Sequence, residues 1–228
     1  MQIKLNGVCK SFSEAAGQQV ILDNIDVCIN SGEVVALIGP SGSGKTTLLN
    51  LISGIDEPDS GELLIGDNDS VLNLRQMDDE QKTLFRRHSI GFIFQFFNLI
   101  PTLNVLENIQ FPLDLCNRLN HSSAESITQL LQRLSIDNKQ QQYPEYLSGG
   151  EQQRVAIARA IIHQPKILLA DEPTGNLDDE TGQQVMELLL QLAKEYKMTL
   201  LIVTHSQEVA QQADRILSLK NGRFLEYE

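Results

Sequence analysis

The sequence lacks tryptophan altogether and has three cysteines among its 228 residues. Cys9, Cys28 and Cys116 are odd in number and lack metal-type spacing, which disfavours a disulfide framework and predicts reduced thiols in a cytosolic protein. Long apolar runs are also missing, because stretches such as residues 200–203 are far shorter than the roughly 20 residues that cross a bilayer. We therefore expect no direct membrane insertion.

Basic residues are scarce as well. Lys and Arg total 18 against 30 Asp and Glu, which gives a formal net charge of −12. Neutralising nucleic-acid phosphates requires basic patches, so this balance disfavours nucleic-acid binding. It also gives no support for direct binding to anionic lipid. If the protein works at a membrane, a protein partner must bring it there.

The sequence does contain a glycine-rich stretch, residues 39–47, that fits the phosphate-binding pattern G-x-x-x-x-G-K-[ST]. The apolar run before it (residues 34–38) predicts a buried parallel strand, and residues 47–52 predict a helix. A strand, a glycine turn and a helix N-terminus together aim backbone N–H groups at an anion. A flexible turn with an exposed lysine is the alternative, and the flanking strand and helix count against it. The predicted nucleotide-binding residues are Gly39, Pro40, Ser41, Gly42, Ser43, Gly44, Lys45, Thr46 and Thr47, with Lys45 on the β- and γ-phosphates and the Thr46 hydroxyl on Mg²⁺.

The rest of the chain predicts an α/β fold. Two strand-like stretches, 3–8 and 20–29, flank an expected loop at 13–18, and residues 96–146 have helical periods broken by prolines. We predict one domain over residues 1–228. Its phosphate-loop NTPase core and N-terminal antiparallel β-subdomain comprise 1–95 and 147–228, and a helical subdomain is inserted at 96–146. Further expected strands are 62–66, 90–94, 167–171 and 200–204, a hairpin is expected at 216–225, and helices are expected at 78–87, 149–162, 179–196 and 207–213.

Two carboxylates end the predicted strand at 167–171. Asp171 is placed to bind the Mg²⁺ shell beside the phosphate loop. Glu172, one residue further, points differently and could polarise a water for attack on the γ-phosphate. A pair of solvated acids is the alternative, and the phosphate loop upstream favours the functional interpretation.

A second glycine-rich turn opens a helix at Leu147-Ser148-Gly149-Gly150 and predicts a second anion site. One nucleotide needs only one phosphate loop, so a single chain has one anion site too many. A head-to-tail dimer accounts for the second site, because each nucleotide is then held between the loop of one chain and the Ser-Gly-Gly turn of the other.

Taken together, these motifs, Gln95, residues 175–178 and His205 resemble the ATP-binding subunit of an ABC transporter over essentially the whole chain. The resemblance implies a RecA-like core, an ATPase activity, ATP and Mg²⁺ as cofactors, and a homodimer. On spacing alone Phe12 reads as a core residue and His205 as a surface or capping histidine. The family instead implies that Phe12 stacks on adenine and that His205 is the switch histidine. It also implies that Gln95 contacts Mg²⁺ and the attacking water and that Asp178 lies in the dimer-contact loop. The opposite chain's γ-phosphate is expected to be bound by Ser148, Gly149 and Gly150.

Within the family, residues 96–109 and 173–178 are similar to the branch that serves macrolide export and lipoprotein release. This similarity implies a separate transmembrane permease and a cytoplasmic location on the inner face of the membrane. Phe96 and Phe97 read as core residues by themselves, but the family places them near the groove that receives the permease, so one of them is expected to be exposed. Related cell-division ATPases motivate an alternative, in which ATP-driven closure signals to a membrane partner without transport.

Overall fold

The computed structural model describes residues 1–14, 17–67 and 70–225. Its strands are β1 (Gln2–Glu14), β2 (Gly17–Ile29), β3 (Val34–Ile38), β4 (Ser60–Asp67), β5 (Ser70–Asn73), β6 (Ile90–Ile93), β7 (Ile167–Asp171), β8 (Thr199–Val203), β9 (Arg215–Lys220) and β10 (Arg223–Leu225). Its α-helices are α1 (Lys45–Ile52), α2 (Asp79–Ser89), α3 (Val105–Leu115), α4 (His121–Arg133), α5 (Gly149–Ile161), α6 (Asp179–Glu195) and α7 (Gln207–Ala210). Within these ranges no helix is both long and apolar enough to cross a membrane.

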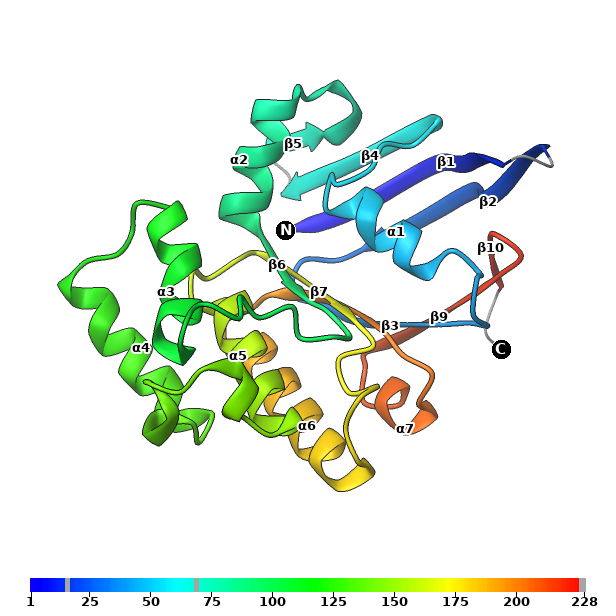
Figure 1. Ribbon diagram of the computed structural model, residues 1–228. Coiled ribbons are helices and arrows are strands. Elements are labelled where there is room, and N and C mark those ends of the chain that lie inside the picture. Colours follow the sequence, from blue (N-terminus) through cyan, green and yellow to red (C-terminus); the bar gives the residue numbers. More distant parts are fainter. Residues whose placement is uncertain (15–16, 68–69, 226–228) are drawn as a thin grey trace.

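The strands form two sheets, with α1 between them (Figure 1). The first is antiparallel, in the order β2-β1-β4-β5. The second has the order β10-β9-β3-β8-β7-β6, and its strands are parallel from β9 to β6, with β10 antiparallel at one edge. This arrangement confirms the predicted α/β fold with an N-terminal antiparallel sheet.

The central strands β3, β7 and β8 of the six-stranded sheet are buried on both faces, which explains why they are nearly continuous apolar runs. Successive residues of β7 alternate between two hydrophobic clusters: Leu168 packs with α5 and α6, whereas Leu169 packs with α1 and the antiparallel sheet. Leu200 and Leu201 of β8 divide in the same way. The period of two in a strand thus fixes the sheet as the middle layer of the molecule.

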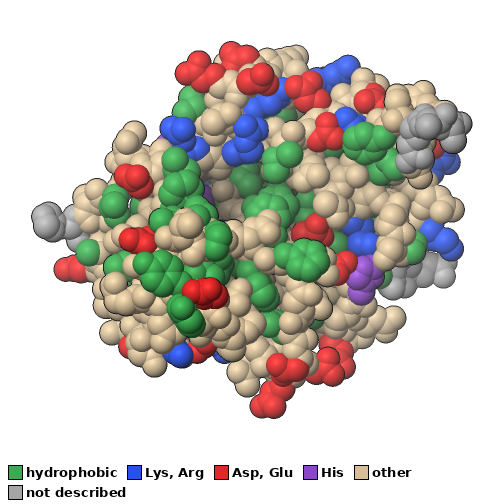
Figure 2. Space-filling model, in the orientation of Figure 1, with side chains coloured by type: hydrophobic (Ala, Val, Ile, Leu, Met, Phe, Trp, Pro, Cys, Tyr) green, Lys and Arg blue, Asp and Glu red, His purple; other side chains and the backbone are tan. Residues whose placement is uncertain are grey.

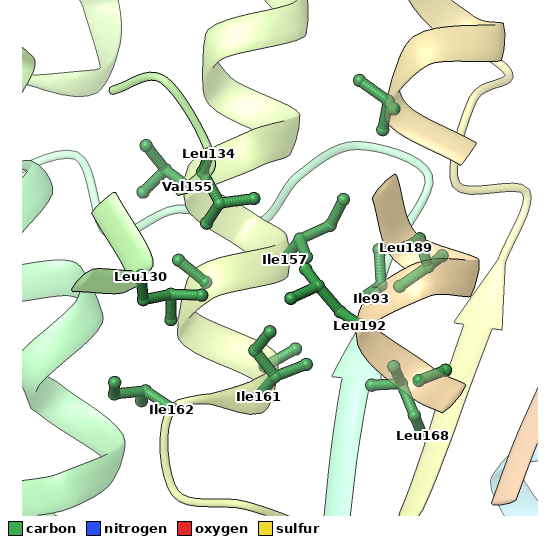
Figure 3. Close-up of a cluster of buried hydrophobic side chains, with 14 of the residues drawn as sticks. Ile93, Leu130, Leu134, Val155, Ile157, Ile161, Ile162, Leu168, Leu189 and Leu192 are labelled. Carbon is green, nitrogen blue, oxygen red and sulfur yellow. The ribbon is translucent and has the colours of Figure 1, made fainter. Parts of the chain in front are cut away.

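The predicted helical region, 96–146, contributes α3 and α4. In Figure 3, Ile157 and Ile161 of α5 lie between the strand residues Ile93 and Leu168 and the side chain of Leu130 on α4. The apolar sides of α3, α4, α5 and α6 therefore share one buried cluster with the sheet. Whether residues 96–146 act as a separate subdomain stays a prediction.

Two local expectations were wrong. The predicted loop at 13–18 is largely strand, since Ser13 pairs with Gln18 and Glu14 with Gly17, while residues 15 and 16 lie outside the described residues. Cross-strand pairing continues here although the small and polar sequence is typical of a turn. The helix expected at 207–213 ends at Ala210, and the short strand β5 was missed.

Candidate active site

The predicted site residues converge at one edge of the six-stranded sheet. The phosphate loop follows β3, Asp171 ends β7, Gln95 lies two residues beyond β6, and His205 lies two residues beyond β8. These four strands are parallel and adjacent, so their carboxyl ends meet at the same edge. The topology therefore brings together residues that lie up to 166 positions apart, since the loop begins at Gly39.

The phosphate loop needs glycine at two positions for reasons of space. At Gly39 a Cβ atom would lie 2.1 Å from the backbone oxygen of Leu219 on β9. Gly44, which precedes α1, has φ +102°, and its Cβ would meet Leu22 on β2 at 2.9 Å. Strands on two sides thus pack directly against the loop backbone and hold it at the N-terminus of α1, where the first amide groups have no partner within the helix.

Lys45 folds back over this loop. Its Nζ donates to the carbonyl oxygens of Gly39 at 2.8 Å and Pro40 at 3.0 Å. Burial lowers the pKa of Lys45, and the carboxylates of Glu172 and Asp171 act in the opposite direction. The buried Ser43 Oγ makes no hydrogen bond among the described residues. The loop therefore offers a cation, helix amides and an unused hydroxyl, a donor set that fits a polyphosphate.

Thr46 and Asp171 are in direct contact, because the Thr46 Oγ1 donates to the Asp171 Oδ2 at 2.9 Å. Burial raises the pKa of Asp171, while the hydrogen bond from Thr46 lowers it. No cluster of three or more His, Cys, Asp or Glu side chains that could hold a metal occurs in the described part of the chain. A hydroxyl and one carboxylate beside a phosphate site suit Mg²⁺, which takes oxygen ligands and usually keeps several waters.

Glu172 is held from two sides. Its Oε2 accepts a hydrogen bond from the Gln95 Nε2 at 3.1 Å, and its Oε1 lies 2.7 Å from the His205 Nε2. The backbone of Glu172 has φ +46°, a conformation that residues other than glycine rarely adopt. Such strain is often found at functional sites, where the surrounding structure maintains it. Here the Glu172 amide donates to the Val203 carbonyl of β8 at 3.0 Å.

Two cavities lie at this edge. One, of about 220 Å³, is lined by the phosphate loop together with Glu172 and His205. The other, of about 480 Å³, is lined by Glu172, His205 and Asp178 among others. Asp178 accepts a hydrogen bond from the Thr181 amide at the start of α6. Glu172 and His205 line both cavities and so connect them.

Other predicted residues do not line these cavities. Ser148, Gly149 and Gly150 start α5, where the Ser148 Oγ accepts a hydrogen bond from the Glu151 amide at 3.3 Å in a capping box. None of the three lines either cavity. Phe12 on β1 is 43% exposed and lines neither cavity. The single chain thus collects the phosphate loop, Asp171, Glu172, Gln95 and His205, and leaves the second glycine-rich turn elsewhere.

Sequence reasoning assigned no individual role to three residues that hold the site loops. Arg159 of α5 donates to the carbonyl of Asn98 and, at 2.9 Å, to that of Phe97. Asn176 Nδ2 donates to the Gln95 carbonyl at 2.6 Å, and the buried Gln153 donates to the Pro173 carbonyl. A signal for Arg159 was present, since it is a lone charge in the apolar run that ends α5.

Comparison with known proteins identifies the family of the chain. The profile of the family described as ABC transporter matches residues 22–175. An uncharacterised ABC transporter ATP-binding protein of Mycobacterium tuberculosis is 45% identical over 98% of this chain and 88% of its own. The lipoprotein-releasing system ATP-binding protein LolD of Legionella pneumophila is 41% identical over 93% of this chain and 92% of its own.

A solved structure of the ATP-binding cassette MJ0796 in a dimeric post-hydrolysis state, bound to ADP and Pi, superposes with a TM-score of 0.89 and 41% identity. The superposition covers 99% of this chain and 97% of that one. The chain therefore belongs to the ABC transporter family as an ATP-binding subunit, and it is an ATPase. Its relatives include a lipoprotein-releasing system ATP-binding protein, as the sequence resemblance predicted.

Proposed function

We propose that two copies of this chain close head to tail around two ATP molecules and drive a separate membrane permease. The observation that carries the proposal is that one chain holds only half of each predicted nucleotide site. The phosphate-loop cavity contains Lys45, Glu172 and His205, but Ser148 at the second glycine-rich turn lies outside it. The solved structure of the cassette MJ0796 is dimeric and bound to ADP and Pi, which supports a nucleotide-bound dimer here. A two-fold pairing of this kind closes on itself and completes both sites together.

In this proposal the phosphates lie at the N-terminus of α1 under Lys45, and Thr46, Asp171 and Gln95 would hold Mg²⁺. Bound there, the ion would neutralise charge on the phosphates. Glu172 accepts the proton of the attacking water. Gln95 and His205 orient its carboxylate by their contacts with one oxygen each. The Ser148, Gly149 and Gly150 turn of the partner chain contributes amides to the γ-phosphate.

The proposed docking surface for the permease is a cavity of about 500 Å³ between α2, β6, α3 and the end of α5. Phe92 and Phe94, whose rings stack at 4.2 Å, lie on one side, and Phe111 lies on another. Figure 2 shows a hollow with hydrophobic side chains around it and basic side chains along its upper margin. Phe96 beside β6 is 72% exposed. A concave apolar surface of this kind suits a short helix from a partner protein.

The similarity to a lipoprotein-releasing ATPase favours export, or the extraction of a lipoprotein or lipid-type substrate, as the transport process. Docking to the permease would hold the chain on the cytoplasmic face of the inner membrane. The permease rather than this chain would select the substrate. In the proposed mechanism, the described cavities of the chain serve the nucleotide and the permease, and none of them binds a transported substrate.

The test of the two-chain site compares wild type with Glu172→Gln by light scattering and phosphate release, with and without Mg-ATP. We expect Glu172→Gln to lower kcat by at least about 100-fold, since general-base catalysis contributes 10²–10⁴-fold. We also expect Mg-ATP to convert this variant to a stable dimer. Normal hydrolysis by a monomeric Glu172→Gln would overturn the proposal.

A matched pair of capping residues tests the head-to-tail geometry. Ser148 and Asn104 each cap a helix through a capping box, so Ser148→Arg and Asn104→Arg lose the same local contact. In the Glu172→Gln background, we expect Ser148→Arg to abolish the ATP-dependent dimer. Asn104→Arg should preserve the dimer, because α3 lies outside the proposed nucleotide interface. Equal effects of both substitutions would mean that capping alone matters.

A further inference from the structure

The side chain of Phe12 has an unusual neighbour. Lys10 lies two residues earlier on β1, and its ammonium lies over the Phe12 ring, 5.1 Å from the centroid. Residues two apart in a strand point to the same face of the sheet, so both side chains project together. Lys10 is buried, whereas Phe12 is 43% exposed. One face of the ring therefore meets a buried cation while the ring stays accessible from solvent.

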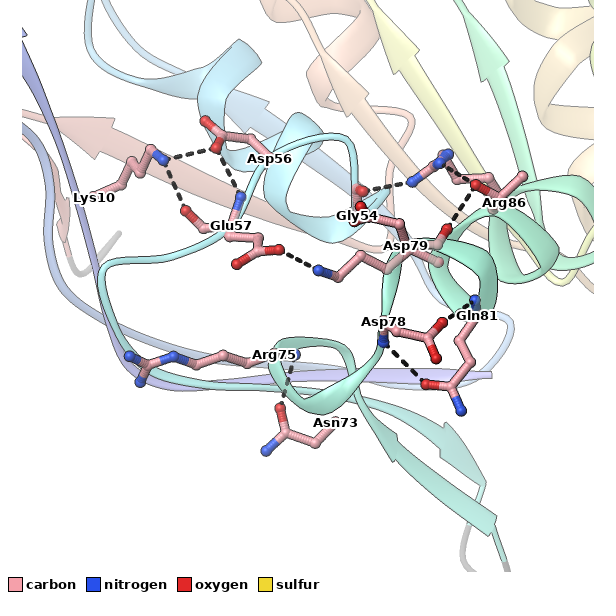
Figure 4. A network of polar contacts seen from close by, with 12 residues as sticks. Lys10, Gly54, Asp56, Glu57, Asn73, Arg75, Asp78, Asp79, Gln81 and Arg86 are labelled. Atoms are coloured by element: carbon pink, nitrogen blue, oxygen red, sulfur yellow. Dashed lines mark hydrogen bonds and ion pairs between the residues drawn. The ribbon is translucent and has the colours of Figure 1, made fainter.

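Lys10 is fixed at its far end by the segment that follows α1. Its Nζ donates to the Asp56 Oδ1 at 2.7 Å and to the Glu57 carbonyl at 2.8 Å (Figure 4). Glu57 is in turn paired with Lys82 of α2. The Lys10 ammonium thus donates two hydrogen bonds to the segment after α1, and these bonds keep it over the Phe12 ring.

The same segment clasps the strand on both sides of Lys10. The Asp59 amide donates to the Cys9 carbonyl at 2.9 Å. The Asp59 Oδ2 accepts from the Ser11 amide at 2.8 Å and from the Ser11 hydroxyl at 2.6 Å. Because residues 53–59 continue directly from α1, whose N-terminus carries the phosphate loop, this clasp fixes Phe12 relative to the phosphate site.

From this geometry we propose that Lys10, anchored by Asp56, is a positioning residue for nucleotide-base binding: it holds one face of the Phe12 ring so that the other receives the base of ATP. The inference rests on the proposed ATP binding and on the stacking role that the family resemblance implies for Phe12. A cation over an aromatic face contributes an interaction that depends on both partners. Base stacking on an aromatic side chain is tolerant of the base, because each base has a π face. Lys10 therefore acts on the base and leaves the phosphates to Lys45.

The experiment measures binding of Mg-ATP and of inorganic tripolyphosphate by calorimetry, using the full chain. Removing the ammonium with Lys10→Met should weaken ATP binding about twofold to fivefold and leave tripolyphosphate binding unchanged. Lys10→Arg keeps a cation and should restore ATP binding. The matched control is Lys4→Met, which removes the same charge from an exposed position on β1 and should change neither ligand.

Phe12→Ala separates the inference from the proposed stacking role on which it rests. We expect this variant to lose at least about fivefold in ATP affinity, and we expect the double variant with Lys10→Met to lose no more. A loss in Phe12→Ala without a loss in Lys10→Met would overturn the role of Lys10 and keep that of Phe12. Unchanged ATP binding by Phe12→Ala would overturn both. Equal losses of ATP and tripolyphosphate in Lys10→Met would also overturn the inference, and thermal melting would identify a folding defect as their cause.

Discussion

Gln95 and Glu172 meet at the edge of the six-stranded sheet, where the Gln95 Nε2 donates to the Glu172 Oε2 at 3.1 Å although 77 residues separate them. The contact joins the segment after β6 to the segment after β7. On the other side of the carboxylate, the His205 Nε2 lies 2.7 Å from the Glu172 Oε1. The carboxylate of the proposed base is therefore oriented from two sides. One contact comes from the segment after β6 and the other from the segment after β8.

Removal of the Gln95 amide tests this orientation. Gln95→Ala leaves Glu172 with one partner, and a hydrogen bond to a charged group contributes about 1.5–3 kcal/mol. We expect kcat to fall by about 10-fold to 100-fold, with ADP affinity nearly unchanged. Steady-state ATPase assays and ADP titration provide the measurement. Gln76→Ala, an exposed glutamine on the described surface, is the control and should behave as wild type. Wild-type kcat in Gln95→Ala would contradict the positioning role.

Asp171 should make stability depend on pH. Its pKa is raised above the usual 3.8, mainly by burial. Between the unfolded-state and folded-state pKa values of Asp171, the folded chain therefore binds more protons than the unfolded chain, and the stability that Asp171 contributes is lost as the pH rises through its folded-state pKa. Without nucleotide, Asp171→Asn should be more stable than wild type at neutral pH, and the difference should shrink as the pH falls. Urea unfolding across the acidic range measures this difference.

The control for that experiment is Asp114→Asn on α3, an exposed carboxylate. Its effect on the urea midpoint should be small at every pH. A pH-independent difference between Asp171→Asn and wild type would contradict the role of burial. Mg-ATP should raise the melting temperature of wild type more than that of Asp171→Asn, since the proposed metal contact is lost.

Arg159 should matter for both stability and catalysis. Its half-buried guanidinium holds the carbonyls of Phe97 and Asn98, two residues with positive φ that follow Gln95 closely. Burial lowers the pKa of Arg159, and within the described ranges no carboxylate pairs with it. Arg159→Met leaves both carbonyls without this donor, so we expect a loss of about 1–3 kcal/mol in unfolding free energy together with a lower kcat.

Denaturant unfolding and ATPase assays measure both effects, and Arg159→Lys should give intermediate values because it keeps the charge without the planar fork. Arg133 provides the comparison, since it forms a surface ion pair with Glu195. Arg133→Met should cost less than about 1 kcal/mol and leave kcat unchanged. A folded Arg159→Met with normal kcat would show that the 97–98 segment needs no such support.

Local sequence rules predicted the central strands β3, β7 and β8 well, because strands buried on both faces are continuous apolar runs with sharp ends. They were weaker at 13–18, where Ser13 and Gln18 pair across strands in spite of a turn-like composition. They also missed Lys10, because a lysine in a strand sequence carries no sign that its charge is buried, and they assigned no role to Arg159, although it is a lone charge in an apolar run. Their partners, Asp56 and the carbonyls of Phe97 and Asn98, are distant in sequence or belong to the backbone.

The sequence by itself determined that the chain binds a nucleotide phosphate, because the loop glycines, Lys45 and Thr46 are contiguous and their spacing contains the chemistry. It also determined the family, since Ser148 to Gly150 and Asp171 with Glu172 form recognisable local motifs. Only the tertiary structure decided that Glu172 lies between Gln95 and His205 and that Phe12 lies beside a buried ammonium. The physical reason is that these contacts depend on strand order and on the paths of α1 and α5, which bring remote residues together through burial of shared apolar surface.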